Sequence, residues 1–158
     1  MTKELSLTLL ILLALTLAGG TYMKARQPRG IRNNNPGNIE NNGIEWNGLS
    51  SQQTDNRFYQ FQAPEYGIRA MARILNNYQI KYGLNTVRGL IDRWAPPHEN
   101  DTGSYAEHVA HAAGLHPDQP IEVSEHLSAI IPVMIKHENG LQPYSQAQIE
   151  TGISMAYA

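Results

Sequence analysis

A glutamate stands at the end of an apolar stripe in the last third of the chain. Between Ser124 and Gly140, positions 127, 131 and 134 are apolar and recur at helical spacing, which predicts one helix there. Ser124 is the predicted N-cap, and Asn139-Gly140 is a strong helix stop. Glu138 follows Met134 by four residues, so its carboxyl group continues the core-facing stripe into the last helical turn.

The position of Glu138 favours a general acid. Partial burial disfavours a charged carboxylate, and the carbonyl end of a helix repels an anion. Both effects favour the protonated form, which a general acid needs before it donates its proton. The alternative is an exposed glutamate in a fraying last turn. Pro132 lies inside the predicted helix, and we expect it to kink the helix or to force a new start.

The segment 29–40 is rich in asparagine and opens the folded part of the chain. Three consecutive asparagines followed by Pro-Gly form no regular helix or strand, so we predict a turn-rich loop. Its side-chain amides, among them those of Asn35 and Asn38, match the hydroxyl and acetamido groups of sugars as hydrogen-bonding partners. The alternative is an ordinary polar connection.

Two short aromatic segments, 44–48 and 57–61, follow this loop and predict a small antiparallel hairpin or lobe. Trp46 is either a stacking platform for a sugar or part of the lobe's own core. Three acids lie in or beside the lobe, and any one of them could face a cleft: Glu40, Glu45 and Asp55.

Apolar periodicity and capping residues predict the remaining elements as helices. The expected helices cover residues 64–82, 86–94, 102–113 and 146–156. The predicted fold class is therefore mainly α with a small β-lobe. The 158 residues, 41% of them hydrophobic, suffice for one globular domain with a sizeable core. The chain has no cysteine and a formal net charge of −2, which exclude disulfides and thiolate chemistry and argue against nucleic acid as a partner.

Several segments resemble the lysozyme-like superfamily. Residues 34–39 (Asn-Asn-Pro-Gly-Asn-Ile), 46–48 (Trp-Asn-Gly) and 58–61 (Phe-Tyr-Gln-Phe) resemble its Asn-rich loop and β-lobe. Residues 97–105 are similar to the Pro-x-Glu-Thr-x-x-Tyr signature of goose-type lysozymes and lytic transglycosylases, with Asp101 where those enzymes have glutamate. Residues 29–156 as a whole resemble small phage and prophage proteins associated with virions or lysis.

This resemblance implies a peptidoglycan-degrading glycosidase, either a muramidase or a lytic transglycosylase, which acts on glycan strands in host lysis or wall penetration. Glu138 would protonate the leaving glycosidic oxygen. Glu40, or else Glu45 or Asp55, would supply a second carboxylate. The residues expected along the substrate cleft are Asn35, Asn38, Trp46, Asp101 and Tyr105.

The order of the elements departs from that superfamily. Its catalytic glutamate ends a helix that precedes the Asn-rich loop, whereas here an apolar segment precedes the loop. A helix that ends in a suitable glutamate stands instead near the C-terminus. We therefore predict a circularly permuted lysozyme-like domain, a rearrangement that compact domains tolerate because their termini often lie close together.

Residues 1–23 predict a signal peptide or signal-anchor, residues 24–29 a linker and residues 30–158 the catalytic domain. No charge occurs from residue 5 to residue 23, and this length is just sufficient to cross a bilayer, which takes roughly 20 residues. The basic residues that follow favour a cytoplasmic C-terminal side, but wall degradation requires export. We expect a monomer in the periplasm, tethered to or exported across the inner membrane, or associated with a virion.

Two other functional classes fit the sequence. One is a non-catalytic virion structural or wall-binding protein, and the other is a peptidoglycan endopeptidase. A zinc peptidase could use His108 and His111, which lie three residues apart on one predicted helix. No His-Glu-x-x-His pattern occurs, however, and we expect neither a metal site nor a cofactor.

Overall fold

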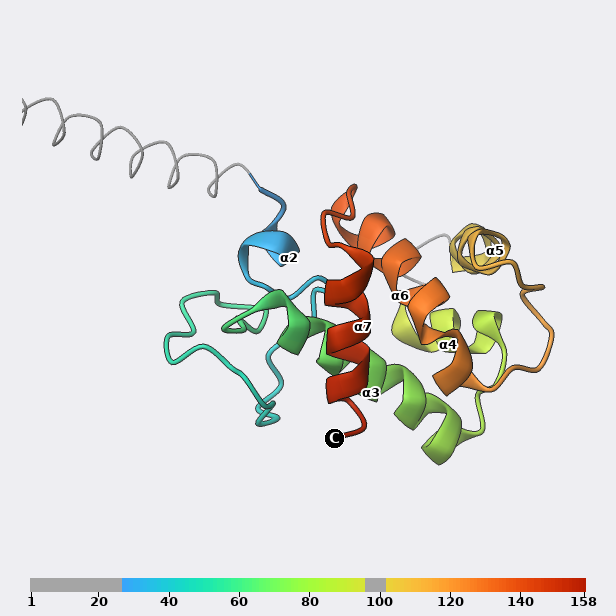
Figure 1. Ribbon diagram of the computed structural model, residues 1–158, viewed down its shortest axis with the longest axis horizontal. Coiled ribbons are helices and arrows are strands. Elements are labelled where there is room, and N and C mark those ends of the chain that lie inside the picture. Colours follow the sequence, from blue (N-terminus) through green and yellow to red (C-terminus); the bar gives the residue numbers. More distant parts are fainter. Residues whose placement is uncertain (1–26, 96–101) are drawn as a thin grey trace, which may run out of the picture.

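The described part of the protein, residues 27–95 and 102–158 of a computed structural model, is mainly helical. Figure 1 shows the helices in space. Their bounds are α2 Arg29–Arg32, α3 Pro64–Tyr82, α4 Val87–Trp94, α5 Thr102–Ala112, α6 Val123–Asn139 and α7 Gln146–Met155. The apolar segment 5–23 and Asp101 lie outside the described residues. Within the described ranges, no helix is both long and apolar enough to cross a bilayer.

The capping residues explain where the predicted helices begin and end. The α3 helix begins at Pro64 and stops at Gly83, which adopts the left-handed conformation. The hydroxyl of Thr86 accepts the Gly89 N–H at the start of α4. A capping box formed by Ser145 and Gln148 starts α7. These helices confirm the predictions for residues 64–82, 86–94 and 146–156 to within a residue.

The α6 helix confirms the apolar stripe but corrects two details. It begins at Val123 with Glu122 as the N-cap residue, and the Ser124 hydroxyl donates to the Glu122 carboxylate, so the predicted N-cap at Ser124 is wrong. It also continues through Pro132 as a single helix, so the predicted new start is wrong as well. The apolar side chains on both sides of Pro132 are fully buried, and their packing holds the helix together: Leu127, Ile130, Ile131, Met134 and Ile135.

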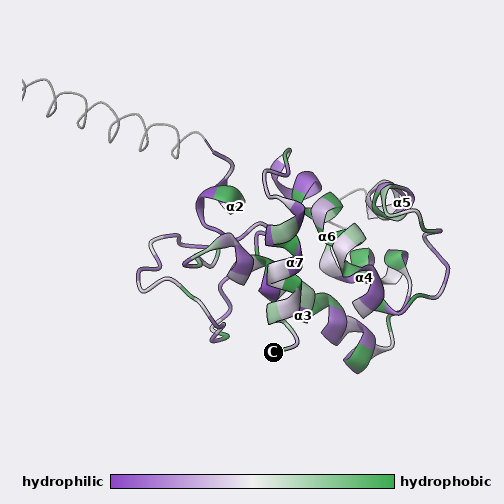
Figure 2. Ribbon diagram, in the orientation of Figure 1, coloured by the Kyte–Doolittle hydropathy of each residue, from purple (hydrophilic) through white to green (hydrophobic). Residues whose placement is uncertain are grey.

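One hydrophobic core holds the helices together. The α7 helix lies across α3, and α6 packs against α3, α5 and α7 (Figure 1). Burial of these apolar faces is the main stabilising contribution to a fold of this kind. Figure 2 shows the hydrophobic residues concentrated on the helices, whereas the loop region between α2 and α3 is mostly hydrophilic or neutral. That loop region is the lobe, residues 40–62.

The lobe is less regular than a hairpin. In the described residues, its extended pairing consists of two isolated antiparallel bridges, Glu40 with Phe58 and Leu49 with Phe61. The Gln60 carboxamide explains part of this irregularity, because its oxygen accepts backbone N–H groups at 54 and 55 that a longer ladder would use. Tyr59 and Phe61 form a second, small core at the base of the lobe.

Candidate active site

The asparagine-rich loop is built by its own side chains. Asn34 and Asn38 adopt left-handed backbone conformations, with φ of 52° and 48°, which asparagine tolerates better than most residues. The Asn34 amide donates to the carbonyl oxygens of Phe61 and Gln62. The Asn35 amide donates to the carbonyl oxygens of Ile39 and Tyr59, and its oxygen accepts the Ile39 N–H. These bonds fasten the loop to the lobe.

Asp55 locks the beginning of the loop to the lobe. Its carboxylate accepts two hydrogen bonds from Arg29, at 2.7 and 2.6 Å, and one from Asn33 at 2.8 Å. It also accepts the backbone N–H groups of Arg57 and Phe58. The Arg29 guanidinium, followed by these other donors, holds the pKa of Asp55 well below its usual range. Arg29 therefore belongs to the folded unit, which begins one residue before the predicted boundary at residue 30.

The C-terminal end of α6 docks on the same loop. The Asn139 amide donates to the Pro36 carbonyl oxygen at 2.7 Å and to the Ile135 carbonyl oxygen at 2.9 Å. The Asn38 amide donates to the Glu138 carbonyl oxygen at 3.2 Å. Gly140 ends the helix in the left-handed conformation, with φ of 73°. Segments about 100 residues apart in the sequence are thereby joined.

Both oxygens of the Glu138 carboxyl group accept hydrogen bonds from N–H groups. Trp94 Nε1, at the end of α4, donates to Oε1 at 3.0 Å, and Asn38 Nδ2 donates to Oε2 at 3.3 Å. Gly37 permits this arrangement, because a Cβ atom at that position would lie 3.0 Å from the Trp94 ring. Glu138 itself is half-buried. Its carboxyl group is thus held in one orientation and remains partly accessible.

Glu138 lies in the wall of a cleft of about 680 Å³ between the lobe and the helices. Tyr105 of α5 is buried there, and its ring stacks on His137 with centroids 3.5 Å apart and planes 7° apart. Burial, and then the charge of Glu138, raises the pKa of Tyr105 far above its usual range. The lining residues are Gly37, Asn38, Ile39, Glu40, Arg57, Phe58, Ile74, Tyr78, Arg93, Trp94, Ala95, Tyr105, His137 and Glu138.

A comparison with curated proteins relates the chain to a phage protein. It is 42% identical over 132 residues to Protein P5 of Pseudoalteromonas phage PM2, a match that covers 82% of each chain. The chain belongs to the family of this phage protein. The bacteriophage association expected from the sequence is thereby confirmed. The name Protein P5 states no activity, and no family model matches the chain.

Four of the predicted site residues line the Glu138 cleft of this protein: Glu138 itself, Asn38, Glu40 and Tyr105. The Glu40 carboxylate forms an ion pair with Arg57 at 2.7 Å and is more than half exposed. The buried Asn35 amide is instead occupied by backbone partners and has a structural role. Trp46 packs against the small core of the lobe and lies outside the cleft lining, which favours the second of its two interpretations.

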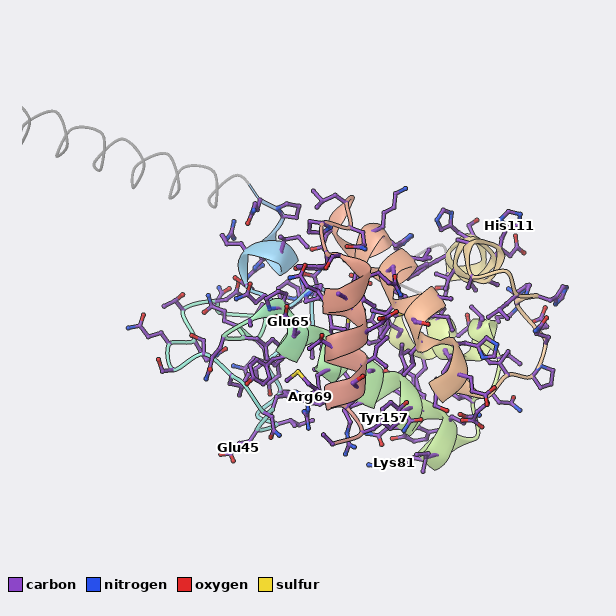
Figure 3. The ribbon with its side chains drawn as sticks, in the orientation of Figure 1. Glu45, Glu65, Arg69, Lys81, His111 and Tyr157 are labelled. Atoms are coloured by element: carbon purple, nitrogen blue, oxygen red, sulfur yellow. The ribbon has the colours of Figure 1, made fainter. Side chains whose placement is uncertain are left out.

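The other acids of the lobe lie away from the cleft. Glu45 is exposed, and Figure 3 shows its side chain pointing outward from the lobe. Asp55 is occupied by Arg29 and Asn33, so neither acid is retained as a second catalytic carboxylate. His108 and His111 are exposed on α5, where Figure 3 shows His111 on its outer side. The described residues contain no group of three His, Cys, Asp or Glu that could hold a metal ion.

Sequence reasoning missed the residue that holds Glu138 most closely. In the predicted helix 86–94, Trp94 is only the last apolar residue. Its indole N–H instead reaches a carboxyl group 44 residues further along the chain. Its position at the end of an amphipathic helix, separated from Pro-Pro only by Ala95, was the available signal, but nothing in the sequence pairs it with Glu138.

Proposed function

We propose that the protein cleaves the glycan strands of peptidoglycan, with Glu138 as the general acid. One observation carries this proposal: the Glu138 carboxyl group lies in the wall of an open cleft and is held by N–H donors at both of its oxygens. An accessible carboxyl group held in one orientation suits proton transfer to a bound substrate. The cleft also presents amide, aromatic and charged side chains, which are the groups that bind sugars.

The proposed reaction begins with the transfer of the Glu138 proton to the glycosidic oxygen. The bond between this oxygen and the anomeric carbon breaks, and positive charge develops on the sugar ring. Trp94 and Asn38 keep the carboxyl group in place and stabilise the carboxylate that remains. In the hydrolytic form, a water molecule then adds to the anomeric carbon and gives up a proton to a base. Glu40, on the lobe side of the same cleft, is the proposed base.

The contacts of α6 support a permuted lysozyme-like arrangement. In the superfamily that the sequence resembles, the helix ending in the catalytic glutamate leads directly into the asparagine-rich loop. Here Asn38 and Asn139 bring the end of α6 onto that loop without a direct chain connection. We propose that the first helix of the ancestral order now stands near the C-terminus. The protein would act on the wall in phage lysis or entry, with residues 5–23 as anchor or export signal.

The decisive experiment compares the wild-type protein with Glu138→Gln on purified bacterial cell walls. Turbidity and the mass spectrum of the released fragments are measured. General acid catalysis contributes about 100- to 10,000-fold, so the variant should lose turbidity clearance almost completely. Glu125→Gln is the matched control, because Glu125 lies in the first turn of the same helix, is exposed and carries the same charge.

The fragments distinguish the classes of reaction. New reducing ends indicate a hydrolase, and anhydro ends indicate a lytic transglycosylase. New amines would indicate a peptidase, and wall binding without fragments would indicate a wall-binding protein; either result would refute the proposal. Clearance by folded Glu138→Gln at the wild-type rate would remove Glu138 from the mechanism.

A further inference from the structure

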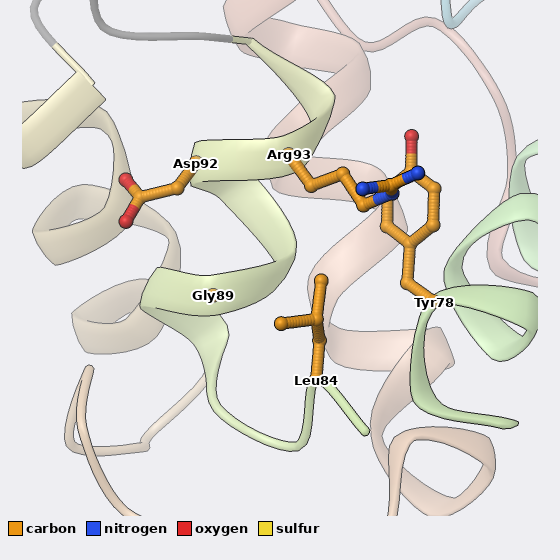
Figure 4. Close-up of a pocket in the computed structure, with 5 residues that line it drawn as sticks. All are labelled: Tyr78, Leu84, Gly89, Asp92 and Arg93. Atoms are coloured by element: carbon orange, nitrogen blue, oxygen red, sulfur yellow. The ribbon is translucent and has the colours of Figure 1, made fainter. Parts of the chain in front are cut away.

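A second cleft adjoins the first. It has a volume of about 640 Å³ and lies between the end of α3 and α4 (Figure 4). Tyr78 and Arg93 line both clefts, so they form the boundary between them. Leu84, Gly89 and Asp92 complete the lining of the second cleft. A ligand that occupies the Glu138 cleft can therefore extend past Arg93 into this space.

Arg93 presents a cation at the boundary. Its guanidinium carbon lies 3.6 Å from the centre of the Tyr82 ring and 5.1 Å from that of Tyr78. These aromatic contacts hold the group while its N–H donors stay at the edge of the plane. Among residues 27–95 and 102–158, no carboxylate forms an ion pair with Arg93, whereas Arg88 on the same helix binds Asp118 at 2.6 Å.

The charges of the second cleft are separated. In Figure 4 the Asp92 side chain extends from the side of α4 opposite to Arg93. A carboxylate ligand is repelled at the Asp92 edge and attracted at the Arg93 edge. Leu84 lies between these edges, and the Tyr78 ring lies beside the Arg93 guanidinium, so both offer apolar surface to a ligand (Figure 4). The cleft therefore fits a small peptide that carries apolar side chains and a free carboxylate.

We infer that this second cleft binds the peptide stem of the glycan strand, with Arg93 bound to a carboxylate of the stem. The inference rests on the proposed function, because it assumes that the first cleft holds the glycan. In peptidoglycan, a short peptide with alanine methyl groups and free carboxylates branches from every second sugar. A guanidinium group binds a carboxylate through two parallel N–H donors, which also fixes its orientation. The preferred substrate is then glycan that still carries its stems.

The test measures binding, so that it does not depend on cleavage. Full-length Glu138→Gln is titrated by calorimetry with a soluble disaccharide–tetrapeptide, with the same disaccharide without peptide, and with a tetrapeptide form whose carboxylates are amidated. The peptide form should bind about tenfold more tightly than the other two, which is the loss expected for one hydrogen-bonded charged contact. Adding Arg93→Gln should abolish this difference, so that the peptide form and the bare disaccharide bind equally.

Lys81→Gln is the matched control for the lost positive charge. Lys81 is exposed at the end of α3, and Figure 3 shows its side chain pointing away from the helices. This control should keep the tenfold preference. Equal affinity for the peptide and bare forms overturns the inference, and so does a loss of preference in Lys81→Gln. Full displacement of the tetrapeptide form by inorganic phosphate at millimolar concentration would show a general anion site and would also overturn it.

The two proposals fail in different ways. A preference for the peptide form that depends on Arg93, found in a protein that releases no sugar ends from walls, would refute the glycosidase and keep the stem site. Glycan cleavage that is equally fast on walls with and without stems, together with equal binding, would refute the stem site and keep the glycosidase.

Discussion

The hydrogen bond from Trp94 to Glu138 offers the sharpest test of how the site is held. Trp94→Phe keeps an aromatic side chain at position 94 but removes the Nε1–H donor, which lies 3.0 Å from Glu138 Oε1. Asn38 remains as the other donor, at the longer distance of 3.3 Å. The carboxyl group should then rotate more freely, and fewer of its orientations will point the proton at the substrate.

The size of the effect follows from the geometry. A hydrogen bond to a charged group contributes about 1.5–3 kcal/mol, and one between neutral groups about 0.5–1.5 kcal/mol. Glu138 is half-buried, so solvent screens the bond and a value in the second range applies, about 1 kcal/mol. If the bond acts mainly in the transition state, kcat falls about fivefold while KM changes little. A similar loss in folding free energy lowers Tm by about 2–4 °C.

Trp46→Phe is the matched control for this variant. It makes the same chemical change in the lobe, outside the cleft lining, where the buried Trp46 Nε1 has no partner among the described residues. Removal of a buried donor without a partner should cost little or even stabilise the protein. Initial rates on soluble glycan strands and thermal unfolding give the readouts. Wild-type kcat in Trp94→Phe, or an equal loss in Trp46→Phe, would refute the positioning role of Trp94.

Two further predictions concern the loop on which α6 docks. The pKa of Asp55 is depressed in the folded protein, so its carboxylate stabilises the fold above the ordinary pKa of 3.8, and this stability is lost as the pH falls below that value. Urea unfolding from neutral to acidic pH measures this loss. Asp55→Asn should flatten the dependence of the unfolding free energy on pH, whereas the exposed Asp92→Asn should not. Asn139→Ala removes two hydrogen bonds, to Pro36 and Ile135, and should cost about 1–2 kcal/mol of unfolding free energy, measured against the exposed Asn47→Ala. Unchanged stability in Asn139→Ala would show that docking does not depend on this side chain.

Local patterns were sufficient to predict most of the helices. The α3 and α7 helices carry their own start and stop signals, Pro64 with Gly83 and Ser145 with Gln148, so their bounds follow from neighbouring residues. The short α2 helix was missed because Arg29–Arg32 is a single turn directly before three asparagines. Its position depends on the pair between Arg29 and Asp55, which are 26 residues apart, and no local pattern indicates such a pair.

Local patterns could likewise predict some residues of the candidate site but not others. Glu138 was identifiable because helical periodicity placed it in line with a buried stripe. The roles of the asparagines were not, because Asn35 and Asn38 have the same side chain and lie in the same loop. Only the backbone path decides that the Asn35 amide turns inward to Tyr59 while the Asn38 amide faces Glu138. The asparagine content of the loop therefore indicates that its side-chain amides form hydrogen bonds, but not which partner each amide faces.

The way α6 meets the loop fits the permuted order of elements that we propose. The contacts that orient Glu138 come from Trp94 and Asn38, and the Asn139 amide docks the same helical turn on Pro36. None of these contacts uses the chain connection after Gly140. A helix with this last turn can therefore dock on the loop from either end of the sequence. What the arrangement does require is that both ends of the domain fold together, because the loop lies near residue 38 and its partner near residue 138. Formation of the site is thus tied to folding of the whole domain rather than to any one segment.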